Sequence, residues 1–214
     1  DPFAAELPLM LITPALFAAN LVVARWAQGA GIPPVFLAFG RWMLAFLILL
    51  NGVFAMSEMA LAASRKARLQ VLAEAGDAGA VVAIDLHDDP TRFLSTVQIG
   101  ITSIGVLNGI VGESAFSQPL AEWLKSTFDI APRIAEVGSL ALVVMIITFL
   151  TIIFGELVPK RVGQLYPETV ARLVARPMRG LAFAARPFVR LLAGSTEAVL
   201  RLIGIRDTHA RGVT

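Results

Sequence analysis

The feature that most constrains this chain is an uncharged run of nineteen residues, 137–155, which leads into the motif Gly-Glu-Leu-Val-Pro-Lys at 155–160. A helix that rises about 1.5 Å per residue needs a run of about this length to cross a hydrocarbon core about 30 Å thick. The run therefore predicts a membrane-spanning helix. Glu156 lies at its end, where a carboxylate must pair, protonate, bind a cation or reach the interface.

The composition supports a membrane protein and narrows the chemistry. The 214 residues are 57% hydrophobic and only 16% charged, and the mean hydropathy is +0.74, which lies outside the range of ordinary soluble domains. There is no cysteine, so oxygen ligands and hard cations are favoured over thiolate metal sites. The two histidines, His87 and His209, are far apart, and we expect neither catalysis nor an organic cofactor.

Three further spans complete a predicted set of four: residues 7–24, a stretch from Val35 or Trp42 to Ala63, and residues 93–112. The span at 93–112 is uncharged but rich in hydroxyl, amide and glycine residues, whose polar groups need partners inside a helix bundle. Gly105 and Gly109 form a small-xxx-small pair that is typical of a helix contact face.

The basic residues predict the orientation. Arg65, Lys66 and Arg68 follow the second span directly, and ten of the 18 lysines and arginines lie at or after Lys160. Because cytoplasmic segments carry the excess of basic residues, both chain ends should be cytoplasmic and 113–135 should be an external loop. Residues 69–89 should form one or two short cytoplasmic helices. The chain is thus predicted to be a multi-pass protein of the cell inner (plasma) membrane.

The region 167–206 has a different character. Five arginines fall within an arc of roughly 80° on one helix, and we expect an amphipathic juxtamembrane belt whose arginines face anionic lipid. Pro177 and Pro187 should bend it, and Ser195 to Glu197 resemble the cap of a further short helix. A solvated helix packed on a soluble domain is the alternative. The five arginines are Arg172, Arg176, Arg179, Arg186 and Arg190.

Three motifs, at 51–61 (Asn-Gly-Val-Phe-Ala-Met-Ser-Glu-Met-Ala-Leu), 93–102 (Phe-Leu-Ser-Thr-Val-Gln-Ile-Gly-Ile-Thr) and 155–161 (Gly-Glu-Leu-Val-Pro-Lys-Arg), carry a family resemblance. From about residue 47 onward the sequence resembles the transmembrane domain of the CNNM/CorC, or hemolysin-like, family of magnesium and cobalt transport proteins. The resemblance implies a three-helix core at 47–166, the juxtamembrane helices at 167–206 and a tail at 207–214. Relatives usually continue into a nucleotide-binding CBS pair, which we expect to be absent here.

Residues 1–46 do not resemble that family. The stretches 17–25 and 34–42 are similar to the first two helices of EamA-type drug/metabolite transporters. We therefore expect a join between the two parts of the chain near residues 45–50. In both families, the helix that contains this join would run from outside to inside.

The resemblance implies a dehydrated Mg²⁺ held between the three core helices. Carried over to this sequence, it points to Ser57 and Glu156, with Gln98, Thr102 and Asn108 as further contributors. One carboxylate plus neutral oxygens can satisfy Mg²⁺ if waters or carbonyls complete about six ligands. This chain has Ile101 and Gly105 where members with direct magnesium evidence carry asparagines, so two amide ligands are lost.

Each of these residues also has a purely structural interpretation. Glu156 can reach the interface or pair with Lys160 at i+4, Ser57 can bond back to its own helix, and Glu58 is expected to face the cytoplasmic boundary or a basic residue. The amides of Gln98, Asn108 and Asn51 can simply join helices by hydrogen bonds.

The sequence thus supports two hypotheses. The leading one is a homodimeric exporter of a divalent cation, with Mg²⁺ as the transported ion and lipids, but no nucleic acid, as partners. The alternative is a non-transporting membrane scaffold or regulatory protein of the same family.

Overall fold

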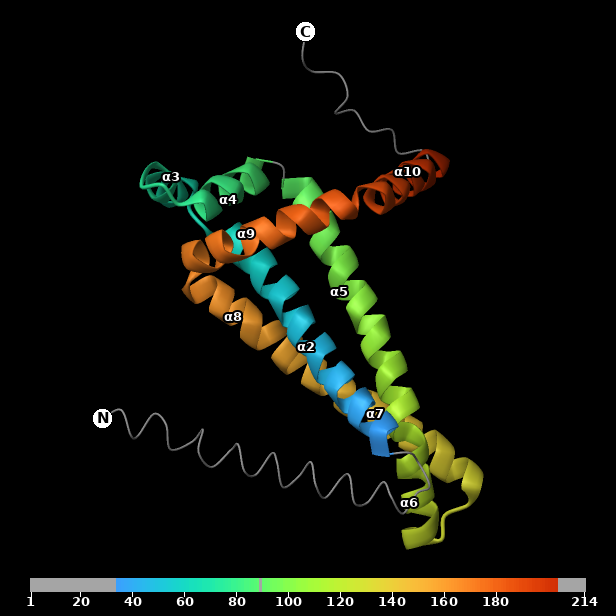
Figure 1. Cartoon of the computed structure of the whole chain (residues 1–214). Coiled ribbons are helices and arrows are strands. Elements are labelled where there is room, and N and C mark those ends of the chain that lie inside the picture. The colour runs from blue at the N-terminus through green and yellow to red at the C-terminus, as the bar shows by residue number, and fades with distance from the viewer. Residues whose placement is uncertain (1–33, 89, 204–214) are drawn as a thin grey trace, which may run out of the picture. The chain divides into compact units, whose positions relative to one another are not determined.

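The computed structural model describes residues 34–88 and 90–203, and every regular element in these ranges is helical (Figure 1). Three stretches are long and apolar enough to cross a membrane: Ala38–Ala63, Phe93–Phe128 and Pro132–Leu165. The prediction of an all-helical membrane protein is confirmed, while the first predicted span, 7–24, and the tail 207–214 lie outside the described residues. The α-helices are α2 (Pro34–Ala63), α3 (Lys66–Glu74), α4 (Ala78–Asp88), α5 (Pro90–Gly112), α6 (Gln118–Phe128), α7 (Pro132–Ile152), α8 (Val158–Leu165), α9 (Pro167–Ala184) and α10 (Arg186–Leu202).

The described chain forms two compact units, and the first comprises residues 34–52 and 103–157. Its hydrophobic cluster joins Leu44 and Ile48 of α2 to Val143 and Ile147 of α7, so these two helices run in the same direction. Helix α5 runs the opposite way, because it ends where Ala115 lies against Gly40, near the start of α2. The remaining apolar residues packed on the cluster are Val111, Phe116, Leu120 and Leu150.

The second unit comprises residues 53–102 and 158–203, and its main contact is between α4 and α9. The apolar face of α9 is buried, including Val174 and Met178, and α4 buries Val82 and Ala83. Gly79 allows the close approach, because a Cβ there would collide with the backbone carbonyl of Arg172. The apolar face of α9 therefore packs largely against α4.

The juxtamembrane belt consists of two helices, α9 and α10, separated at Ala185. The break comes just before Pro187, whereas Pro177 is accommodated inside α9. The expected cap at Ser195 is wrong: α10 continues through it, and the hydroxyls of Ser195 and Thr196 donate to the carbonyls of Leu191 and Leu192. Both hydroxyls bond within the helix, so neither serves as a cap.

The segment that follows α5 is more ordered than a loop. A π-helical turn, η1 (Glu113–Ser117), continues directly into α6, and Asp129, which follows the end of α6, has a left-handed conformation with φ 51°. Lys125 of α6 pairs with Glu136 of α7 at 2.8 Å. The predicted short helices at 69–89 are confirmed as α3 and α4.

Candidate functional site

A layer of polar side chains adjoins the hydrophobic cluster of the first unit. Asn51 follows Ile48 by one turn of α2, and Thr151 follows Ile147 by one turn of α7. On the antiparallel α5, Asn108 precedes Val111 by one turn. Residues three or four apart share a helix face. All three side chains are therefore displaced from the cluster in the same direction, toward the C-terminal end of α7, which Glu156 follows in the chain.

A break in α7 shapes this layer. Residues Ile153–Leu157 form a π-helical turn, η2, which contains Glu156. Pro159 explains the break, because proline lacks the N–H that would bond the carbonyl of Gly155 and its ring crowds that same carbonyl. Asn51 supplies the missing donor: its Nδ2 donates to the Gly155 oxygen at 3.0 Å. π-Helical turns of this kind occur frequently at functional sites.

Close packing favours glycine at position 155. It is buried, and a Cβ on it would lie 3.1 Å from Asn51 Nδ2 and 3.3 Å from the carbonyl oxygen of Ile48. The absence of a side chain therefore lets α2 approach the opened turn. Glu156 comes next in the chain and is partly buried, so its carboxylate lies between the protein interior and the surface.

Four polar atoms of this layer are buried without a hydrogen-bond partner in the protein: Asn51 Oδ1, Asn108 Oδ1, Asn108 Nδ2 and Thr151 Oγ1. Asn51 and Asn108 are only 3% and 2% exposed. Leaving such a group unsatisfied costs about 1–3 kcal/mol, so each one requires an explanation, such as a bound ion, ligand or water. Three of the four are oxygens, and all four lie in the unit that holds Glu156.

Within residues 34–88 and 90–203, no three His, Cys, Asp or Glu side chains gather into a cluster that could hold a metal. The layer instead contains neutral oxygens, and the carboxylate of Glu156 follows Thr151 by five residues in the chain. Such a set can accept hydrogen bonds from an ammonium group or donate electron pairs to a hard cation.

The second unit contains, among other predicted residues, Ser57, Glu58 and Lys160. Ser57 is fully buried, and its hydroxyl donates to the carbonyl of Phe54 at 2.7 Å, which is the back-bonding alternative. Glu58 Oε2 lies 3.5 Å from Lys160 Nζ, so this acid faces a basic residue as expected. The Ser57 oxygen keeps its acceptor capacity while it donates to its own helix.

Gln98 and Thr102 are exposed on α5, unlike Asn108. Gly105 and Gly109 continue the same helix face, and a Cβ on either glycine would meet no atom within 4 Å. Asn108 lies about 240° around the helix from Thr102 at about 100° per residue. The structure thus separates these predicted ligands into an exposed stripe and one buried amide.

The five arginines of the juxtamembrane belt differ in their contacts. Arg172 Nη1 lies 2.7 Å from Asp77 Oδ2 and Arg179 Nη1 lies 3.8 Å from Asp85 Oδ2, so both pair with carboxylates at or near α4. Arg186 stacks on the ring of Phe183 at 4.4 Å, and Arg176 and Arg190 are exposed. Hydrogen bonds from the backbone of Ala80, then from Arg172, hold the pKa of Asp77 below its ordinary value.

Thr151 is the residue of the layer that sequence reasoning did not select as a site residue. Its spacing contained the signal, since it shares a helix face with Val143 and Ile147 and lies five residues before Glu156. A hydroxyl on the buried stripe of a spanning helix, just before a Gly-Glu-x-x-Pro break, indicates a polar pocket.

The fold and the polar layer define a multi-pass helical membrane protein with buried, unsatisfied oxygens inside its helix core. Residues 42–214 match the family described as the cyclin M transmembrane N-terminal domain, and the chain belongs to that family. The resemblance inferred from the three motifs is thereby confirmed.

Three curated relatives illustrate the likeness. A UPF0053 protein of Synechocystis is 45% identical over 168 residues, which are 78% of this chain and 37% of the relative. Proteins named polyamine export protein, from Salmonella typhimurium and Escherichia coli K12, are 39% and 36% identical over the same shares of both chains. The chain therefore spans little more than a third of the length of these relatives.

Proposed function

We propose that the chain is the membrane part of a cation exporter and that its cargo passes through the polar layer of the first unit. The observation that carries the proposal is the set of buried oxygens without partners on Asn51, Asn108 and Thr151. A helix-joining role would leave these groups bonded to one another or to backbone, because unsatisfied buried groups weaken a fold. This argues against the scaffold alternative.

The cargo we propose first is a polyamine. The relatives named polyamine export protein match 78% of this chain. A primary ammonium donates three hydrogen bonds and accepts none, so it suits a layer of neutral oxygens with one carboxylate. Glu156 would offset the positive charge, and the amide and hydroxyl oxygens would replace the water around the nitrogen.

Mg²⁺ is the second candidate. The loss of two family amides at Ile101 and Gly105 is partly offset, because Asn108 supplies a buried amide one turn beyond Gly105. Mg²⁺ prefers carboxylate, carbonyl and water oxygens, and it demands a near-octahedral set at about 2.0–2.1 Å. Those requirements are stricter than the requirements of an ammonium group.

Exposed α5 positions support a homodimer as the working form. Gln98, Thr102, Gly105 and Gly109 share one helix face, and polar and small residues on a spanning helix favour another helix over lipid. We further propose an inner-membrane location with a cytoplasmic C-terminus, where the CBS pair of longer relatives would follow.

Flux measurements in liposomes test the function. Spermidine release and Mg²⁺ flux would be followed for the reconstituted chain, for Glu156→Gln and for the control Glu74→Gln, whose carboxylate is exposed at the end of α3. Loss of a charged hydrogen-bond partner predicts about a tenfold or greater drop in flux for Glu156→Gln alone. Equal flux in protein-free and protein-containing liposomes would refute transport, and the cargo that moves would decide between the candidates.

A further inference from the structure

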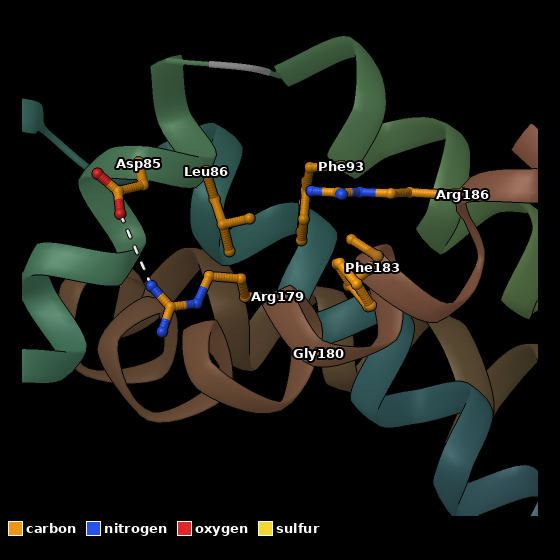
Figure 2. A pocket seen from close by; sticks show the side chains of 8 residues that line it. Asp85, Leu86, Phe93, Arg179, Gly180, Phe183 and Arg186 are labelled. Atoms are coloured by element: carbon orange, nitrogen blue, oxygen red, sulfur yellow. Dashed lines mark ion pairs between the residues drawn. The ribbon is translucent and has the colours of Figure 1, made fainter. Parts of the chain in front are cut away.

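A second feature of the molecule has no role in the proposed transport path. In the second unit, a pocket of about 450 Å³ is lined by residues of α4, α5, α9 and α10 (Figure 2). This volume lies in the range of small-molecule sites. Its lining consists of Asp85, Leu86, Phe93, Arg179, Gly180, Ala182, Phe183 and Arg186.

The lining of the pocket includes buried apolar residues, one of which begins a candidate span. Phe93 is 2% exposed and Ala182 is 5% exposed. Phe93 is also the first residue of the candidate span Phe93–Phe128. Hydrocarbon gives way to headgroups at the start of a membrane span, so an apolar wall at Phe93 suits the glycerol and upper acyl region of a lipid.

The two arginines of the pocket have different partners. Arg179 points toward Asp85, and the two side chains form an ion pair at 3.8 Å (Figure 2). Arg186 reaches over the ring of Phe183, with its guanidinium carbon 4.4 Å from the ring centroid. Within the described part of the chain, no carboxylate pairs with Arg186. The ring fixes this guanidinium at the pocket while its N–H donors stay available.

The charges therefore specify the ligand. Two arginines and one aspartate give the pocket a formal charge of +1, which matches the single negative charge of a phosphodiester. Guanidinium groups bind phosphate oxygens in a bidentate manner. Phe183 lines the pocket and is exposed, and Phe188 and Leu191 are exposed apolar residues on the following helix α10, which suits an amphiphile rather than a free anion.

We propose that this pocket binds the headgroup of an anionic phospholipid, with Arg186 as the direct phosphate ligand and with Leu86, Phe93 and Phe183 against the glycerol and upper acyl chains. The occupant is one defined lipid, which differs from a diffuse attraction of the belt to a charged membrane surface. The site is separate from the polar layer and does not depend on the transported cargo.

Native mass spectrometry of the purified chain in a neutral detergent tests the proposal. Phosphatidylglycerol and phosphatidylcholine would be added separately at equal concentrations, and glycerol 3-phosphate would be added in a third arm. We expect phosphatidylglycerol to be retained about tenfold more than phosphatidylcholine, and glycerol 3-phosphate to be retained no better than in buffer. Retention of glycerol 3-phosphate as strong as that of the lipid would overturn the lipid assignment.

Variants of Arg186 and Arg190 distinguish binding in the pocket from a general attraction of lipid to surface charge. Arg186→Gln should abolish the preference, Arg186→Lys should keep part of it as a point charge without the planar fork, and Arg190→Gln should leave it unchanged. Arg190 is exposed on the same helix but does not line the pocket. An equal loss in Arg186→Gln and Arg190→Gln would contradict the proposal. Phe183→Leu provides the same test through the stacked ring, should Arg186→Gln fail to fold.

Discussion

The two units of the molecule differ in how their polar and charged side chains are partnered. In the second unit several charges form ion pairs: Lys66 with Asp88, Arg68 with Glu168, and Lys160 with Glu58. In the first unit, amide and hydroxyl groups are buried beside a hydrophobic cluster and several of their atoms have no partner. Polar groups that hold helices together are bonded. The first unit therefore bears a cost that a bound ion, ligand or water would offset.

The largest effect on the first unit is expected from Asn108→Leu, which replaces the amide by an apolar group of similar size. If the amide serves transport alone, removing its two unsatisfied atoms should stabilise the protein by about 1–3 kcal/mol and lower flux at least about tenfold. Thermal unfolding in detergent and liposome flux measure the two effects. A destabilised variant with normal flux would show that Asn108 is structural.

Gly79→Ala probes the second unit, where packing dominates. The new Cβ would collide with the Arg172 carbonyl, so α4 and α9 must separate, at a cost of roughly 1–3 kcal/mol. Gly194→Ala is the matched control, because a Cβ there meets nothing within 4 Å and helix propensity predicts a gain of about 0.5–1 kcal/mol. The same sign of change in unfolding temperature for both variants would contradict the observed packing.

Asn51→Leu sharpens the comparison inside the first unit. Asn51 combines a bonded atom with an orphan one, since Nδ2 donates to Gly155 while Oδ1 has no partner. The variant should lose flux as Asn108→Leu does, but should destabilise by about 1 kcal/mol because the Gly155 carbonyl loses its donor. Thermal unfolding measures both variants, and we expect a lower unfolding temperature for Asn51→Leu and a higher one for Asn108→Leu. A change of the same sign in both variants would contradict the role of Asn51 as the donor to the Gly155 carbonyl in η2.

Acid should affect the second unit slightly and in a defined direction. Because hydrogen bonds hold the pKa of Asp77 below its ordinary value of 3.8, its stabilising effect is complete above that pH and is lost as the pH falls through the lower folded value. Proteolysis between α3 and α4 at decreasing pH would measure the loosening. In Asp77→Asn this acid-dependent step should be missing, and an unchanged step would assign it to another group.

The sequence predicted the three spans of the described residues, because long uncharged runs are typical of membrane-spanning helices. It also pointed to Asn51, Asn108 and Glu156. It could not decide which face of α5 is buried, because Gln98, Thr102 and Asn108 are equally polar and only tertiary packing distinguishes them. The contact between α9 and α4 could not be predicted for a similar reason: an amphipathic helix has one pattern whether lipid or another helix covers its apolar face.

The π-helical turns show what local rules can add. Pro159 follows Gly155 by four residues, and Pro119 follows Ala115 by four, and each small residue lies in a π-helical turn. The proline removes one helical hydrogen bond in each case. The sequence therefore contained both breaks, but the use of Asn51 to satisfy one of them depends on a contact between residues 104 positions apart.

The central claim is that the unsatisfied oxygens of the first unit bind the transported cation. Isothermal titration of the purified chain with spermidine, and then with Mg²⁺, tests it most directly, using wild type, Asn108→Leu, Glu156→Gln and the control Glu74→Gln. The account predicts a binding isotherm for one of these cations in wild type and Glu74→Gln that both site variants abolish. Identical isotherms in all four proteins, or no binding of either cation to wild type, would contradict it.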